Sequence, residues 1–160
     1  MVTVVDEQQL QDRIREFIRQ FGLLDQEYTP CGRPLPTSQA HALQILSDGG
    51  VATQRDLATR LNLDESTVSR LVDQLVRRGW VDRATDEHNR RQSRLALTAE
   101  GCAVLDDIRV ASATKFHLIR ERIPPDKWHN VLDALDVLIA AVGKDTSSDA
   151  YTADGRAHAR

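Results

Sequence analysis

The sequence has few of the features that mark secreted or membrane proteins. Its 160 residues contain two cysteines, Cys31 and Cys102, which is too few for a disulfide framework and is typical of a reducing compartment. No apolar run approaches the ~18 residues of a membrane-spanning helix. The first ten residues lack the basic start and apolar core of a signal peptide. We therefore expect one compact protein in the cytoplasm, with no membrane partner.

Motifs for catalysis and for metal binding are missing as well. The sequence has no G-x-S-x-G, no glycine-rich phosphate loop, no H-E-x-x-H and no C-x-x-C. We therefore predict no enzyme, no cofactor and no metal site. One alternative stays open, in which Cys31 acts as a thiol or metal sensor.

The charge is unevenly distributed along the chain. Overall the formal net charge is −3, which is unlike a uniformly basic nucleic-acid coat. Residues 66–94, however, contain seven arginines against four acidic residues, and the flanking segments are net acidic. This partition is expected if only the middle of the chain meets phosphate.

Residues 53–79 have the pattern of two short helices joined by a tight turn. Thr53 with Asp56 three residues later resembles a capping box, and Asp64 is a suitable N-cap for the second helix. The second helix places Val68, Leu71, Val72, Leu75 and Val76 on one side, and Gly79 is placed to end it. The pattern predicts a helix-turn-helix.

The opposite side of that second helix carries small hydroxyls followed by arginine. We predict that this face enters the major groove of DNA, and that Arg70 reads a base because its guanidinium matches guanine O6 and N7. The predicted DNA-contacting residues of the face are Ser66, Thr67, Ser69, Arg70, Gln74 and Arg77. A solvated helix face is the plainer interpretation of the same spacing.

Two short strands follow the helix-turn-helix. Residues 80–84 and 93–97 alternate in the way a hairpin requires, and the polar tip between them carries Arg90 and Arg91. Two cations at a hairpin tip suit insertion into a minor groove, where negative potential is concentrated. The segment 38–98 is therefore predicted to be a winged helix that binds duplex DNA. A winged helix used for protein contact would not need these arginines.

The rest of the chain reads as helices with apolar stripes. The apolar stripes at residues 10–24 and 128–142 have to be buried against another apolar surface. The same stripes of a second copy of the chain provide such a surface. We expect a mainly α fold with a two-stranded wing, in which residues 1–37 and 99–142 form a homodimerisation region. Helices are predicted over 6–24, from a cap at Thr37 or Ser38 to Ser47, from Thr98 to Arg122, and from Asp126 to 142. Residues 143–160 have almost nothing to bury and are predicted to be a disordered tail.

This order of elements resembles the multiple-antibiotic-resistance regulator (MarR) family of bacterial transcription factors. The most specific residues are Asp86, Arg91 and the run Leu97-Thr98-Ala99-Glu100-Gly101, while the chain departs from the family at His88 and Asn89. The resemblance implies a homodimeric repressor of a near-palindromic operator, with Arg91 in the minor groove.

The resemblance also implies a small aromatic or lipophilic effector. Relatives bind such compounds in a crevice beside the DNA-binding lobe, and Arg13, Phe17 and His41 are our candidates for its lining. Other relatives sense zinc, peroxides or electrophiles, and the stretch of Cys31 and His41 is where certain zinc-responsive members place ligands.

Overall fold

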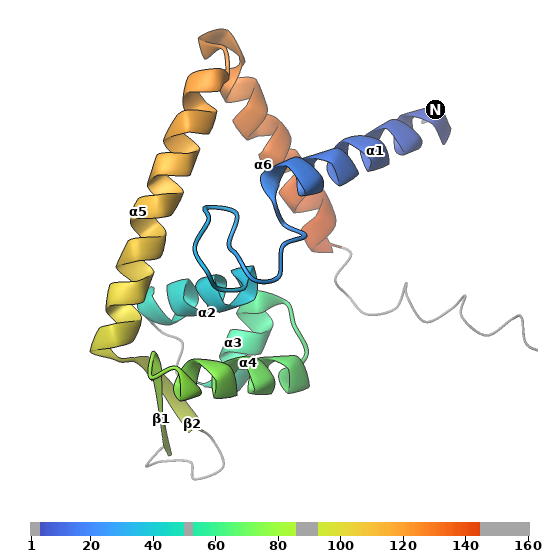
Figure 1. Cartoon of the computed structure of the whole chain (residues 1–160). Coiled ribbons are helices and arrows are strands. Elements are labelled where there is room, and N and C mark those ends of the chain that lie inside the picture. The colour runs from blue at the N-terminus through green and yellow to red at the C-terminus, as the bar shows by residue number, and fades with distance from the viewer. Residues whose placement is uncertain (1–3, 50–52, 86–92, 145–160) are drawn as a thin grey trace, which may run out of the picture. The chain divides into compact units, whose positions relative to one another are not determined.

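The protein is described by a computed structural model that covers residues 4–49, 53–85 and 93–144. It is mainly helical with one two-stranded antiparallel sheet, as the sequence predicted (Figure 1). The elements in chain order are α1 (Val4–Phe21), α2 (Thr37–Ser47), α3 (Gln54–Leu61), α4 (Glu65–Arg77), β1 (Val81–Thr85), β2 (Ser93–Leu97), α5 (Ala99–Arg122), the short 3-10 helix η1 (Pro125–Lys127) and α6 (Trp128–Lys144).

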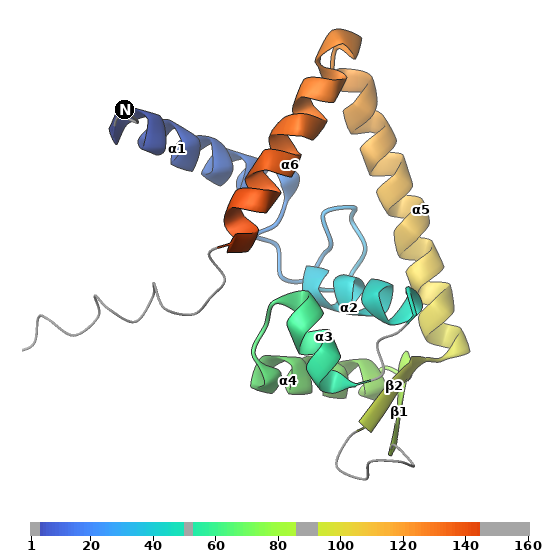
Figure 2. The same ribbon diagram turned by 180° about the vertical axis from the view of Figure 1, so that it is seen from behind.

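The chain divides into two compact units, one ending at Lys115 and the other starting at Phe116. In the first unit α3 packs on both α2 and α4, and the hairpin of β1 and β2 projects beside them (Figures 1 and 2). The largest fully buried side chains of this core are Leu43, Leu57, Val68, Val72, Leu75, Val81 and Leu105. Since Leu105 belongs to α5, the first turns of that helix complete the core of the helix-turn-helix.

Three basic side chains hold α5 against the N-terminal half of the same unit. The Lys115 ammonium donates to the carbonyls of Phe21 and Pro30, at 2.9 and 2.5 Å. The Arg33 guanidinium donates to the Asp107 carbonyl at 3.2 Å, and Arg109 donates to the Ser47 hydroxyl at 2.6 Å. Lys115 thereby satisfies a carbonyl at the end of α1 and one in the loop that follows it.

The hairpin pairs residue by residue from Val81 opposite Leu97 to Thr85 opposite Ser93. Its first strand begins one residue later than predicted, because the Trp80 amide still donates to the Leu75 carbonyl at the end of α4. Gly79 has a φ of +74°, which lets the chain leave α4 and turn into the strand.

The second unit contains the end of α5, η1 and α6. Pro124 and Pro125 end α5 and begin η1, since proline cannot continue a helix but fits its first turn. The Arg120 guanidinium lies 4.4 Å from the centre of the Trp128 ring, which joins the two helices across the turn.

Several predicted helix ends differ from the structure. Helix α1 begins at Val4 rather than at residue 6, and α6 runs from Trp128 to Lys144 rather than from Asp126 to 142. The cap of α2 is Pro36, and neither Thr37 nor Ser38 takes that position. The fixed φ of proline suits the entry to a helix, and the Thr37 hydroxyl is instead buried with no hydrogen-bond partner in the part of the chain that the structure describes. Helix α1 ends at Phe21 rather than at 24, because Gly22 adopts a φ of +87° and closes the last turn.

Candidate nucleic-acid interface

The turn between α3 and α4 is built by local capping. The Thr53 hydroxyl accepts a hydrogen bond from the Asp56 amide, as predicted, and so caps the start of α3. Asn62 ends α3 in the left-handed conformation, with a φ of 53°, a region that asparagine tolerates better than most residues. Asp64 then caps α4, two residues after Asn62. Cap chemistry depends on neighbours in sequence, which is why these signals could be read from the sequence.

Helix α4 separates its apolar and polar sides as the periodicity indicated. Val68, Val72 and Leu75 are fully buried, whereas Ser66 and Arg70 are exposed. Of the other predicted DNA-contacting residues of α4, Gln74 and Arg77 are exposed, and Thr67 and Ser69 are half-buried. Val76 is an exception, because it was expected on the apolar side and is 38% exposed.

Arg70 and Arg77 are available for an external partner. Neither forms a hydrogen bond or an ion pair within the part of the chain that the structure describes. Arg78, by contrast, lies over the Trp80 ring, with 4.7 Å between the guanidinium carbon and the ring centre. Two exposed, unneutralised guanidinium groups on one helix side suit binding to phosphate and to base edges.

The N-terminal end of α4 is organised around the Asp64 carboxylate. It accepts hydrogen bonds from the Ser66 hydroxyl at 2.5 Å, from the Thr67 hydroxyl at 2.6 Å and from the Thr67 amide at 2.8 Å. The bonds from Ser66 and then Thr67 hold the pKa of the Asp64 carboxyl well below its usual range. The capped form is therefore present at neutral pH, and its stabilisation is lost only as the pH falls through this lowered pKa.

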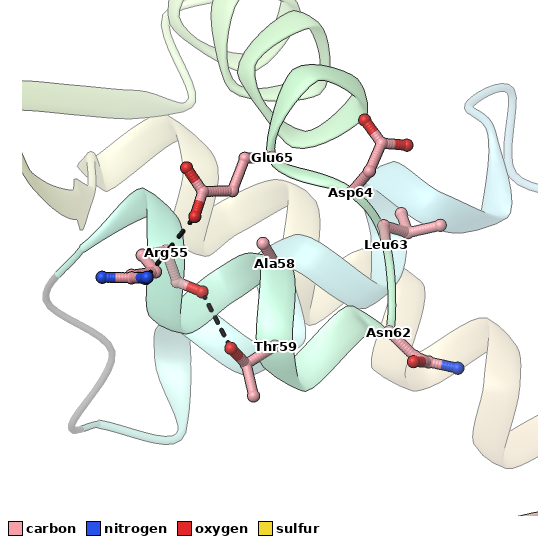
Figure 3. Close-up of a pocket in the computed structure, with 7 residues that line it drawn as sticks. All are labelled: Arg55, Ala58, Thr59, Asn62, Leu63, Asp64 and Glu65. Carbon is pink, nitrogen blue, oxygen red and sulfur yellow. Dashed lines mark hydrogen bonds and ion pairs between the residues drawn. The ribbon is translucent and has the colours of Figure 1, made fainter. Parts of the chain in front are cut away.

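An open pocket lies beside this turn, between α3 and the start of α4 (Figure 3). Figure 3 shows the Glu65 carboxylate turned toward Arg55, at an N–O distance of 3.5 Å, and the Asp64 carboxylate on the far side of the turn. The Thr59 hydroxyl donates to the Arg55 carbonyl at 3.2 Å. The charged side chains of the lining are thus already paired, Arg55 with Glu65 and Asp64 with the hydroxyls of α4.

A buried glutamine on α2 reaches the outer side of α4. Gln39 is 3% exposed, and its side-chain amide donates to the Gln74 Oε1 atom at 2.8 Å. The side-chain carbonyl oxygen of Gln39 has no hydrogen-bond partner among the described residues. Sequence analysis missed this contact, because the two glutamines are 35 residues apart and each looks like an ordinary helix residue.

We expect Gln39→Met to leave the free energy of unfolding unchanged to within about 1 kcal/mol, or to raise it. The substitution removes a buried, unpaired carbonyl, while the exposed Gln74 side chain recovers its hydrogen bond from water. Urea unfolding measures the change, with Gln44→Met on the same helix as the control, since Gln44 bonds only locally to Asp48. A loss of 3 kcal/mol or more would mean that the amide pair holds α2 and α4 together.

The wing is fastened to α4 through its first strand. The Arg83 guanidinium donates to the Asp73 carboxylate at 2.8 Å. The carboxylate of Asp73 on α4 is therefore bonded to the wing. The predicted minor-groove residues Arg90 and Arg91 lie outside the described residues, as do His88 and Asn89.

The fold and this arrangement match a known family. The MarR family model matches residues 35–93, which run from just before α2 to the start of β2. Residues 35–93 are therefore a MarR-type domain. The members and relatives of the family are transcriptional regulators and not enzymes, which agrees with the missing catalytic motifs.

Individual relatives are distant in sequence. The curated transcriptional regulator PrsX of Escherichia coli is 24% identical over 104 residues, which are 65% of this chain and 57% of PrsX. The chain thus matches a little over half the length of this regulator.

Two solved structures show how far along the chain the likeness in fold extends. FabT of Streptococcus pneumoniae, in complex with DNA, has a TM-score of 0.74 at 17% identity and covers 87% of this chain and 99% of its own. PcaV of Streptomyces coelicolor, with its natural ligand, has a TM-score of 0.65 at 24% identity and covers 89% and 99%. At these identities the likeness establishes the fold, and it reaches well beyond the residues that the MarR family model matches.

The predicted effector residues lie on two helices of the first unit. Arg13 donates to the Gln9 carbonyl within α1, and Phe17 stacks on Phe21 with ring centres 5.2 Å apart. His41 is exposed on α2. These contacts do not join the three side chains to one another, so the lining of the crevice stays a prediction.

Cys31 sits half-buried in the loop before α2. Burial acts to raise the pKa of its thiol, but hydrogen bonds with Thr29, Ser112 and the Arg33 backbone outweigh it and leave the pKa lowered. The Thr29 hydroxyl is 3.0 Å from the sulfur.

Within the described ranges, no three His, Cys, Asp or Glu side chains form a group that could hold a metal. No helix of these ranges is long and apolar enough to cross a bilayer.

Proposed function

We propose that this chain is a ligand-responsive repressor that binds a near-palindromic operator as a homodimer in the bacterial cytoplasm. The observation that carries the proposal is the outer side of α4, where Arg70 and Arg77 are exposed and unneutralised on a MarR-type winged helix. Helices of this kind enter the major groove with their N-terminal residues at the base edges. The DNA complex of FabT, which shares the fold, supports the same role here.

Exposed apolar side chains support the homodimer. Leu10 and Phe17 of α1 are 51% and 54% exposed, and Ile139 and Val142 of α6 are 67% and 59% exposed. Such side chains at helical spacing need a cover, and a two-fold partner supplies the same surface. A dimer would present two copies of α4 to half-sites about 34 Å apart.

A small aromatic or lipophilic effector would act by moving the two copies of α4 out of register with their half-sites. PcaV, which shares the fold, has a natural ligand. In this chain Arg13, Phe17 and His41 remain our candidates for the lining. Adding a panel of aromatic acids to the operator complex described next tests this part of the proposal.

The decisive experiment begins with duplexes selected from a random pool. We expect Arg70→Ala to weaken operator binding by about 1–3 kcal/mol per half-site and to relax the preference at one base position in each. Arg91→Ala should weaken binding with less effect on the major-groove consensus, because minor-groove contacts distinguish bases poorly. Affinities for a panel of single-base operator variants measure both effects.

Arg122→Ala is the matched control, since it removes the same charge from an exposed position at the end of α5. It should leave the affinity and the preference unchanged. Raising the salt concentration should weaken wild-type binding steeply, because phosphate contacts release counterions. Equal base profiles for Arg70→Ala and Arg91→Ala would defeat the assignment of roles. A protein that selects no duplex at low salt would favour a winged helix used for protein contact.

A further inference from the structure

At the N-terminal end of α4, the hydroxyl protons of Ser66 and Thr67 are both used in hydrogen bonds within the protein. A hydroxyl has one proton to donate and two lone pairs to accept with. The Ser66 and Thr67 hydroxyls both donate to the Asp64 carboxylate, at 2.5 and 2.6 Å. These are the distances of charge-assisted O–H···O⁻ bonds, which are about twice as strong as bonds between neutral groups.

The charge around this end disfavours turning those protons toward the DNA. Pointing a proton at a base carbonyl would exchange a charge-assisted bond for a neutral one. Pointing it at a phosphate would leave the Asp64 carboxylate short of a donor beside a second anion. Asp64 and Glu65 carry two negative charges, Arg55 carries one positive charge, and the helix dipole adds roughly half a positive charge, so the sum stays negative.

We propose that Asp64 is a specificity-determining residue, because it makes the Ser66 and Thr67 hydroxyls pure acceptors that read an amino group on a base edge. In the major groove the amino groups are N4 of cytosine and N6 of adenine, whereas guanine and thymine present carbonyl oxygens. The contacted strand of each half-site then carries cytosine or adenine at the position facing these hydroxyls. The inference rests on the proposed function and deepens it.

Ser66→Ala and Thr67→Val locate the position, since each removes a hydroxyl with little change in size. In the selected operator, wild-type protein should prefer cytosine or adenine there over guanine or thymine by about 5- to 150-fold, the usual range for one base pair. Both variants should lower this preference. If wild-type protein selected thymine and Thr67→Val kept that preference, the Thr67 methyl group would be reading the base. This result would overturn the proposal.

Asp64→Asn tests the role of the carboxylate. Asparagine caps helices as well as aspartate, so the fold is retained, and circular dichroism checks it. Its amide nitrogen, however, donates to the Thr67 hydroxyl instead of accepting from it, which frees the Thr67 proton to point outward. We expect the preference for cytosine or adenine to fall at least several-fold, with guanine or thymine gaining.

Glu65→Gln is the matched control, because it removes one negative charge at the same end and leaves both hydroxyls bonded to Asp64. It should strengthen binding at low salt and keep the base preference. If Asp64→Asn and Glu65→Gln had the same base preferences, Asp64 would act only through its negative charge, and the proposal would be overturned. Selection of guanine or thymine by wild type at this position would overturn it too. A protein that selects no duplex at all refutes the proposed function, and this inference with it.

Discussion

Gly101→Ala is expected to destabilise the protein by about 3 kcal/mol, at the upper end of the range for overpacking. A Cβ atom at Gly101 would lie 2.0 Å from the Trp80 carbonyl oxygen and 2.9 Å from its carbonyl carbon. Both atoms are backbone, so no side-chain rotation relieves the clash. The same oxygen accepts the Thr98 amide at 3.0 Å, and that bond is lost if the strand moves away.

Thermal and urea unfolding measure this effect, which corresponds to roughly 6–12 °C in the midpoint for a chain of this size. Gly143→Ala in α6 is the control, since a Cβ there meets nothing within 4 Å. In a helix alanine is favoured over glycine by up to about 1 kcal/mol, so the control should be neutral or slightly stabilising. A Gly101→Ala protein as stable as wild type would show that the start of α5 moves freely against the hairpin.

Loss of α6 is expected to lower operator affinity by about 10²- to 10⁴-fold, the factor gained when two binding modules are linked. Deleting residues 126–160 removes one of the apolar surfaces assigned to the dimer, so a single copy of α4 would have to bind alone. Deleting only residues 145–160 should change neither dimerisation nor affinity, because that segment has no apolar stripe. Light scattering and a gel-shift assay measure the two quantities.

A point substitution separates dimerisation from folding. Ile139 is 67% exposed, so Ile139→Glu should leave the protomer folded and yet give monomers. Ala141→Glu, which adds the same charge to the same helix about 200° around its axis, is the control. A stable dimer after the deletion, or after Ile139→Glu, would mean that the copies meet through another surface.

The sequence allowed the helix-turn-helix to be predicted because its signals are local. Thr53 and Asp64 cap helices through residues three positions away, and the period of 3.6 separates Val72 from Arg70 without knowledge of the fold. Periodicity does not show how far a covering layer extends, and for this reason it did not predict that Val76 is 38% exposed. The cap of α2 was missed because Pro36 begins that helix by its fixed backbone angle rather than by a side-chain bond.

By itself, then, the amino-acid sequence determined the resemblance to the MarR family, the winged helix and the exposed side of α4, since all three rest on residue types at short spacings. Tertiary structure alone decided what those residues are bonded to. Gln39 meets Gln74, and Arg83 meets Asp73, only after the helices and the hairpin have packed. Gly101 shows the difference most clearly, because its place after Leu97-Thr98 is visible in the sequence. The reason for glycine there is the carbonyl of Trp80, 21 residues earlier, which the fold brings within 2.0 Å of where a Cβ would stand.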